Sequence, residues 1–230
     1  MDKEKRPYVI MKKRLFAIGD IHGCYEPLME LIEHKIEIIK SDRLVFLGDY
    51  IDRGNQSREV IDYIIGLQKK DFEIITLIGN HESMLLNALD NDEFLSEWIQ
   101  NGGSATLKSF GIKSLKQLDQ QYIDFFRGLQ FYYFIDNFLF VHAGFNNRIS
   151  DPFEDRYHML WSRREKYTNP ALKDKIIIHG HTPVPELSCK QDIQNKNQVI
   201  NIDTGCVYSD IDGYGRLSAF EPYSGELISV

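Results

Sequence analysis

One apolar run with a polar, glycine-flanked ending decides how this chain folds: Arg43-Leu44-Val45-Phe46-Leu47-Gly48-Asp49-Tyr50-Ile51-Asp52-Arg53-Gly54. Residues 43–47, apolar after Arg43, have the length and composition of a buried β-strand. Gly48 permits a tight turn, and two carboxylates and a guanidinium follow it directly. A strand that ends in such a group indicates a ligand site at its carboxyl end.

The same form occurs on both sides of this stretch. Residues 14–18, apolar after Arg14, lead into Gly19-Asp20-Ile21-His22-Gly23, and residues 73–78 lead into Gly79-Asn80-His81-Glu82. Between these runs, apolar residues recur at helical spacing near 27–32 and 57–65. The alternation predicts parallel strands joined by crossover helices, with their polar endings at one edge of the sheet.

Two later strands end in histidines. Residues 138–141 lead into His142-Ala143-Gly144, and residues 175–178 lead into His179-Gly180-His181-Thr182. Residues 130–135 pair naturally with 138–141 across the Asp136-Asn137 turn, and further short strands are expected near 199–200, 216–220 and 226–230. The histidine endings resemble the acidic ones in position and predict that all five meet.

A mainly helical pattern covers about 83–129, with a break at residues 101–104. Ser114 and Gln117 resemble a capping box that opens a helix running to residue 129. The chain shows no internal repeat and no low-complexity linker. We therefore expect a single domain over 1–230 with a helical insertion at about 83–129.

The composition is that of a folded soluble protein: 230 residues, 43% hydrophobic and 27% charged, with a net charge of −7. The acidic balance disfavours general nucleic-acid binding. No apolar run approaches the ~18 residues of a membrane span, so we expect no membrane association. Three widely spaced cysteines predict reduced thiols, and we expect a cytoplasmic monomer.

The five polar segments hold oxygen and imidazole donors and no cysteine, which favours a pair of first-row divalent metals over structural zinc. Two such ions add about +4, while two carboxylates and a hydroxide remove about 3, so a site near +1 remains for phosphate. Asn80 fits as a neutral oxygen ligand, because a third carboxylate would cancel this attraction.

The segments fit the signatures GDxHG, GDxxDRG and GNHE, followed by two histidine motifs. Their combination resembles the phosphoprotein phosphatase branch of the calcineurin-like metallophosphoesterases, including its compact bacterial and bacteriophage lambda type, from Asp20 to Thr182. The resemblance implies a mixed α and β fold, in which two mixed β-sheets form a sandwich flanked by helices. The site would lie at one edge of that sandwich.

The resemblance also implies the roles of individual residues. Asp49 would bridge two metal ions within this ligand set: Asp20, His22, Asp49, Asn80, His142 and His181. His81 would protonate the leaving group, and Asp52 would orient its ring and keep it protonated. Arg53 and Arg163 would bind phosphate oxygens. Manganese is the expected metal, with iron or zinc as alternatives.

Other polar residues near these motifs are predicted to be structural. In the family's motif the histidine after glycine is the ligand, which selects His181 over His179. His34 and His158 are also predicted to be structural. Glu82 is expected to bond the backbone or the ligating histidines.

We expect hydrolysis of phosphoserine and phosphothreonine, with phosphotyrosine as a further candidate, by a hydroxide held between the metals. Ile78 stands where protein phosphatases often carry arginine before GNHE. This leaves open a hydrolase of dinucleoside polyphosphates, such as diadenosine tetraphosphate, or of RNA caps. Glu82, where symmetrical diadenosine tetraphosphate hydrolases commonly have aspartate, favours the phosphatases. A non-catalytic binding relative is disfavoured, because every ligand position is filled.

Overall fold

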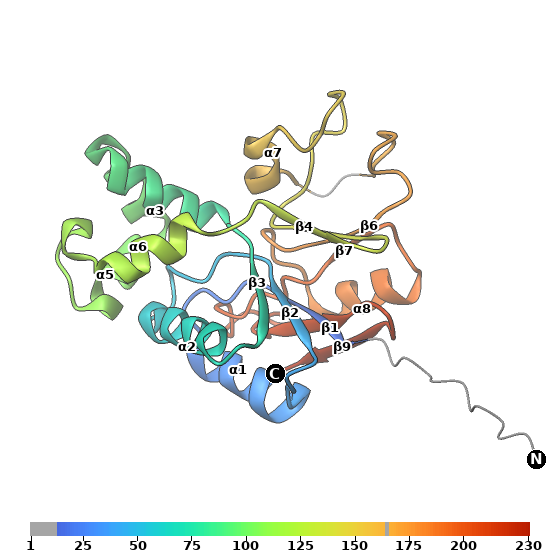
Figure 1. Cartoon of the computed structure of the whole chain (residues 1–230), viewed down its shortest axis with the longest axis horizontal. Coiled ribbons are helices and arrows are strands. Elements are labelled where there is room, and N and C mark those ends of the chain that lie inside the picture. Colours follow the sequence, from blue (N-terminus) through green and yellow to red (C-terminus); the bar gives the residue numbers. More distant parts are fainter. Residues whose placement is uncertain (1–12, 164–165) are drawn as a thin grey trace, which may run out of the picture.

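The computed structural model describes residues 13–163 and 166–230 and shows two mixed β-sheets packed face to face (Figure 1). The first sheet has the order β3 (Glu73–Thr76), β2 (Arg43–Phe46), β1 (Leu15–Ile18), β8 (Ser218–Glu221) and β9 (Glu226–Ser229). The second has the order β4 (Tyr132–Ile135), β5 (Phe138–Val141), β6 (Ile176–His179) and β7 (Val199–Asn201). The predicted sandwich is confirmed.

Strand directions explain why the polar endings meet. Strands β1, β2 and β3 are parallel, and so are β5, β6 and β7. Antiparallel β8, β9 and β4 complete the sheets. The carboxyl ends of parallel strands lie at one edge of their sheet, so the segments that follow β1, β2, β3, β5 and β6 are brought together.

The central strands are buried on both faces, and their residues alternate between two cores. In β1, Leu15 and Ala17 face the interior of the sandwich, where they join Phe140 and Ile178 from the second sheet. Residues 16 and 18 face the helical layer. This double burial produces the continuous apolar runs seen in the sequence.

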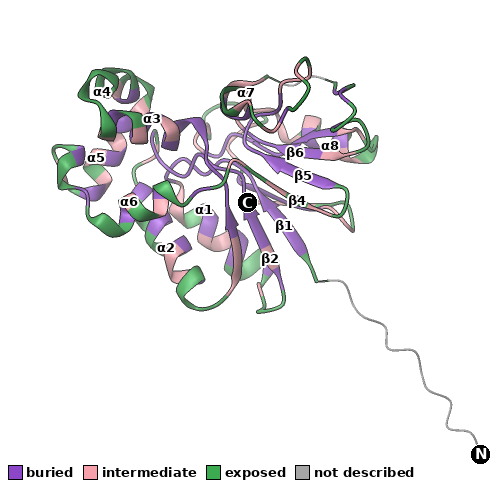
Figure 2. Ribbon diagram, turned by 45° about the horizontal axis from the view of Figure 1, so that its top comes forward, coloured by how far each residue is buried: buried purple, intermediate pink, exposed green. Residues whose placement is uncertain are grey.

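Helices cover the outer faces (Figure 2). Helix α1 (Tyr25–Met29), its continuation η1 (Glu30–Ile36) and α2 (Ser57–Lys69) pack on the first sheet. On the second sheet lie α7 (Arg156–Trp161) and the loops around it, and α8 (Glu186–Gln194) packs beside β7. No described helix is both long and apolar enough to cross a bilayer.

The segment between β3 and β4 is helical, as its pattern predicts. It contains α3 (Asn80–Asp90), η2 (Asp92–Phe94), α4 (Leu95–Trp98), η3 (Ile99–Gly103), α5 (Ser104–Phe110), η4 (Leu115–Gln117) and α6 (Gln120–Arg127).

One local prediction in this segment is wrong and another is confirmed. Ser114 caps only the short η4, because Leu118 is extended and α6 starts anew after Asp119. The predicted break near residue 102 is a kink at Gly102 (φ 109°) inside a helical stretch, a conformation that glycine adopts readily.

Candidate metal centre

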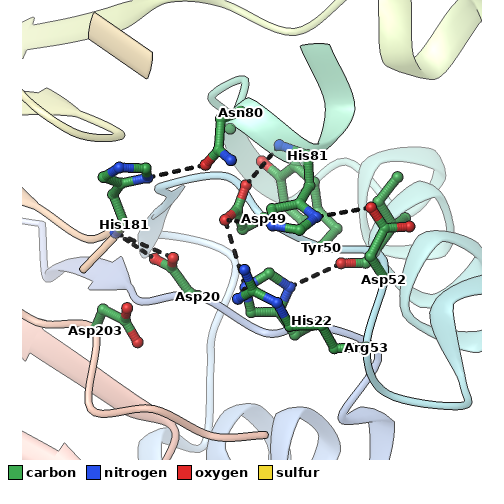
Figure 3. Close-up of polar contacts among 12 residues, drawn as sticks. Asp20, His22, Asp49, Tyr50, Asp52, Arg53, Asn80, His81, His181 and Asp203 are labelled. Carbon is green, nitrogen blue, oxygen red and sulfur yellow. Dashed lines mark hydrogen bonds and ion pairs between the residues drawn. The ribbon is translucent and has the colours of Figure 1, made fainter. Parts of the chain in front are cut away.

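Five polar segments converge at one edge of the sandwich; Figure 3 shows Asp20, Asp49, Asn80 and His181 from four of them, and His142 from the fifth contacts Asn80 and His181. Asp20 follows β1, Asp49 follows β2 and Asn80 begins α3 after β3, while His142 and His181 follow β5 and β6. All but His181 are buried, and His181 is half-buried. The structure thus brings the predicted strand endings together at one edge of the sandwich.

Close packing at this edge explains the glycines of the motifs. A Cβ at Gly180 would lie 2.0 Å from Asp20 Oδ1, and one at Gly79 would lie 2.1 Å from Asp49 Oδ1. Asp49 and His181 themselves have positive φ, at 52° and 74°, which is uncommon for residues other than glycine. Such strained backbone clusters at functional sites.

Acceptor atoms face one another at one end of the centre. The ring of His142 donates from Nδ1 to the carbonyl of Leu47 at 3.0 Å, and burial lowers its pKa. The neutral ring therefore presents the lone pair of Nε2 to Asn80 Oδ1, 2.9 Å away. His181 Nδ1 is also 2.9 Å from that oxygen, and burial lowers the pKa of His181 to about 3. Three atoms that can bind a metal, one oxygen and two imidazole nitrogens, therefore meet at this end, which fits a shared cation.

The opposite end is built around His22. Its Nδ1 donates to the carbonyl of Ile51 at 2.8 Å, and burial lowers its pKa to about 3. Its Nε2 then lies 3.4 Å from Asp49 Oδ2 and accepts from Arg53 Nη1 at 2.6 Å. Asp49 lies between the two ends, since its Oδ1 is 3.6 Å from His142 Nε2.

His81 and Asp52 form the buried pair that the sequence predicts. His81 Nδ1 lies 2.7 Å from Asp52 Oδ2. Burial favours the neutral ring, but Asp49 and Asp52 outweigh it, so the pKa of His81 is raised. Its Nε2 has no hydrogen-bond partner among the described residues and lies 4.0 Å from Asp49 Oδ2. A buried donor without a partner, facing the centre, suits proton transfer to a bound ligand.

Two residues that the sequence interpretation missed hold Asp52 in place. Trp98 Nε1 donates to Asp52 Oδ2 at 2.9 Å, and Thr106 Oγ1 donates to Asp52 Oδ1 at 2.6 Å. Both come from the helical segment between β3 and β4. The sequence contains one sign of this packing, the glycine pair Gly102-Gly103. A larger residue at position 103 would not fit, because a Cβ there would lie 2.5 Å from the Trp98 ring.

A third missed residue, Asp203, lies beside Asp20 in Figure 3. Both oxygens of Asp20 accept from the backbone N–H of His181, at 3.0 and 3.3 Å. Burial, with the charge of Asp203 and Asp49, raises the pKa of Asp20, and burial with Asp49 raises that of Asp203 to about 7. Such crowding of buried carboxylates favours bound cations.

The residues predicted to be structural lie outside the centre or support its backbone. Glu82 accepts from the backbone N–H groups of Asp49, Tyr50 and Gly79, at 2.9 to 3.0 Å. His34 is exposed, and His158 pairs with Asp155 in α7. His179 is buried in β6, where its Nδ1 lies 3.0 Å from the carbonyl of Gly180.

Arg163 is separated from the other predicted phosphate ligand. It is exposed after α7, where it lines a pocket of about 420 Å³ with Tyr157 and Trp161. The pocket adjoins the His181 end of the centre through Trp161, whose ring centroid lies 6.0 Å from that of His181.

The donor set fits divalent metals. Potential metal donors form two groups, and within each group the donor atoms lie within 4.8 Å of one another. The first group is His22, Asp49 and His81, and the second is Asp49, His142 and His181. They share Asp49, as the predicted bridge requires. The first group contains His81, whereas the predicted ligand set has Asp20 at this place. The oxygens of Asp20 instead accept hydrogen bonds from the backbone N–H of His181. The assignment of individual ligands therefore stays a prediction.

Comparison with known proteins gives one family and one fold. The family model of the calcineurin-like phosphoesterases matches residues 13–210. A bis(5'-nucleosyl)-tetraphosphatase (asymmetrical) from Anoxybacillus flavithermus is 26% identical over 93% of this chain and 92% of its own. The crystal structure of a putative diadenosine tetraphosphatase has TM-score 0.64 and 21% identity, and covers 98% of this chain and 95% of its own. A protein serine/threonine phosphatase from Saccharomyces cerevisiae has TM-score 0.66 and 16% identity, and covers 97% and 80%.

Proposed function

We propose that this chain, which belongs to the calcineurin-like phosphoesterase family, hydrolyses phosphoanhydride bonds of dinucleoside polyphosphates such as diadenosine tetraphosphate. The proposal depends mainly on one observation: relatives named bis(5'-nucleosyl)-tetraphosphatase match this chain over about 93% of its length. The serine/threonine phosphatase matches at 16% identity and supports the fold alone. The dinucleotide hypothesis therefore replaces the protein phosphatase hypothesis as the leading one.

Two residues that left the substrate open in the sequence have clear positions in the structure. Ile78 is 6% exposed and packs in the core beneath the helices, so that position offers no cation to a phosphate ester. Glu82 is occupied by backbone N–H groups. The carboxylate of Glu82 therefore stabilises the turn after β2, and a glutamate at this position gives no information about the substrate.

The centre would hold two divalent cations through this set: Asp20, His22, Asp49, Asn80, His142 and His181. Such ions neutralise phosphate charge and lower the pKa of a coordinated water. Imidazole with carboxylate suits manganese, iron and zinc alike, and we propose manganese.

The chain's own residues would supply the proton and hold the phosphates. His81 keeps a proton at Nδ1 for Asp52 and directs Nε2 into the centre, where it would donate to the leaving nucleotide. Arg53 lies 5.9 Å from the ring centroid of Tyr208 and reaches His22, so its guanidinium borders the centre. A fork of N–H donors there suits non-bridging phosphate oxygens.

Turnover of two substrates tests the proposal. With Mn²⁺ supplied, kcat/KM for diadenosine tetraphosphate is expected to exceed that for a phosphoserine peptide by at least about tenfold, which is about 1.4 kcal/mol in transition-state binding. Chromatography of the products separates asymmetrical cleavage, to ATP and AMP, from symmetrical cleavage, to two ADP.

The His81→Asn variant, prepared in parallel, shows whether the activity belongs to this protein. A peptide turned over faster than the dinucleotide would overturn the proposal and restore the phosphatase hypothesis.

A further inference from the structure

We propose that the pocket on α7 binds a nucleobase of the substrate by stacking on Tyr157 and Trp161. This inference rests on the proposed function, because it names how a nucleotide is held beside the metal centre. The pocket measures about 420 Å³, and Arg148, Ser162 and Arg163 line it with the two aromatic rings.

The two rings form a stacking platform. Tyr157 and Trp161 lie one helical turn apart on α7, with ring centroids 6.5 Å apart and planes inclined by only 27°. Tyr157 is 69% exposed, so a large aromatic face is open to solvent. Stacking of a base on such a ring is favourable and tolerates any base, since every base has a π-face.

The platform adjoins the metal centre. The ring of Trp161 lies 6.0 Å from that of His181 and is nearly perpendicular to it, at 86°. A base stacked at Tyr157 would therefore have its phosphate chain within reach of the His181 end of the centre. This places the nucleoside on the side opposite Arg53.

Helix α7 is fixed to the strand ending that carries His142. The backbone N–H of Ala143 donates to the carbonyl of Met159 at 2.8 Å. Asp155 caps the helix through the N–H of His158 at 3.0 Å and also accepts from Asn146 Nδ2 at 2.8 Å. The platform is thus rigid relative to the reacting centre, which limits the entropy lost on binding.

Charge in the pocket suits a polyphosphate. Arg148 and Arg163 are both exposed, and neither forms an ion pair with the residues that the structure describes. Two guanidinium groups at one pocket are notable in a chain of net charge −7. A phosphopeptide could use the same cations but has no base to stack, so it is a distinct outcome of the test.

Equilibrium binding of ATP and of inorganic tripolyphosphate tests the subsite directly. Both ligands carry three phosphates and only ATP carries a base, and chelator prevents hydrolysis. ATP is expected to bind the unmodified protein at least about tenfold more tightly than tripolyphosphate. Tyr157→Ala should remove most of this difference and leave tripolyphosphate binding unchanged, while Tyr157→Phe should retain it.

The matched control is Phe134→Ala, because Phe134 is also an exposed aromatic, at 46%, but lies on β4 beside Lys175. It should bind ATP like the unmodified protein. Either of two results would overturn the subsite. In the first, the unmodified protein binds ATP no more tightly than it binds tripolyphosphate. In the second, the Tyr157→Ala variant binds ATP as tightly as the unmodified protein does. If ATP binds through Tyr157 but diadenosine tetraphosphate is not hydrolysed, the subsite stands and the proposed function fails.

Discussion

The metal centre and the α7 pocket adjoin each other but are built in opposite ways. The centre draws its side chains from the ends of five strands in two sheets, and they are almost entirely buried on strained backbone. The pocket is formed by one short helix and the loops beside it, and its side chains are exposed or half-buried. From this difference we expect the buried centre to determine the kind of reaction and the α7 pocket to influence the choice of substrate.

Asp49→Asn should have the largest effect, because it should disable the metal centre without changing the α7 pocket. The bridging carboxylate contacts both ends of the centre, so the neutral amide should release both cations and abolish hydrolysis. Metal content is measured by mass spectrometry of the intact protein, and ATP binding in chelator should stay unchanged. Retention of about two ions per chain would show that Asp49 is not the bridge.

His81→Asn should affect the chemical step and leave the rest intact. Loss of general acid catalysis typically lowers kcat by ~10²–10⁴-fold. KM, metal content and ATP affinity should stay close to those of the unmodified protein, because Nε2 of His81 has no hydrogen-bond partner among the described side chains. Steady-state kinetics and mass spectrometry check this, and an equal loss of metal would make His81 a ligand.

A pair of glycine substitutions gives the smallest expected effects. Gly180→Ala places a Cβ 2.0 Å from Asp20 Oδ1, so Asp20 must turn away from His181, at a cost of about 1–3 kcal/mol in the free energy of unfolding. Gly66→Ala, in the last turn of α2, where an added Cβ would meet nothing within 4 Å, should instead stabilise the protein by about 0.5–1 kcal/mol.

Urea unfolding of both glycine variants measures these changes. Only Gly180→Ala should also weaken metal binding. Equal behaviour of the two variants would show that the packing around Asp20 is not critical.

The arrangement of the strands could be predicted because two independent signals in the sequence indicate it, the apolar runs and the polar residues that follow them. Runs such as 44–47 are apolar throughout because both faces of the strand are buried, and each run leads into a glycine and a polar side chain. The helical segment was harder to predict. Ser114 offers the same capping chemistry to a short 3₁₀ turn as to a long helix, and only tertiary packing separates the two.

The site could be predicted where motifs carry it and not where single residues do. His81 and Asp52 lie 2.7 Å apart as expected, because both belong to glycine-containing strand endings. Trp98 and Thr106 belong to no motif, and a tryptophan or threonine in a helical pattern is normally a packing residue. Their role depends on how α4 and α5 lie over the turn after β2, which local sequence does not specify.

The two bonds from Trp98 and Thr106 to Asp52 also limit how far this protein can be reduced in size. An engineer who excised the helices that follow α3, from η2 to α6, to obtain a minimal catalyst would leave all six proposed metal ligands in the remaining chain. The carboxylate behind His81 would then face water instead of an indole and a hydroxyl. Such a truncated protein should still capture metal ions but turn over slowly, so that portion of the chain has to be kept or rebuilt.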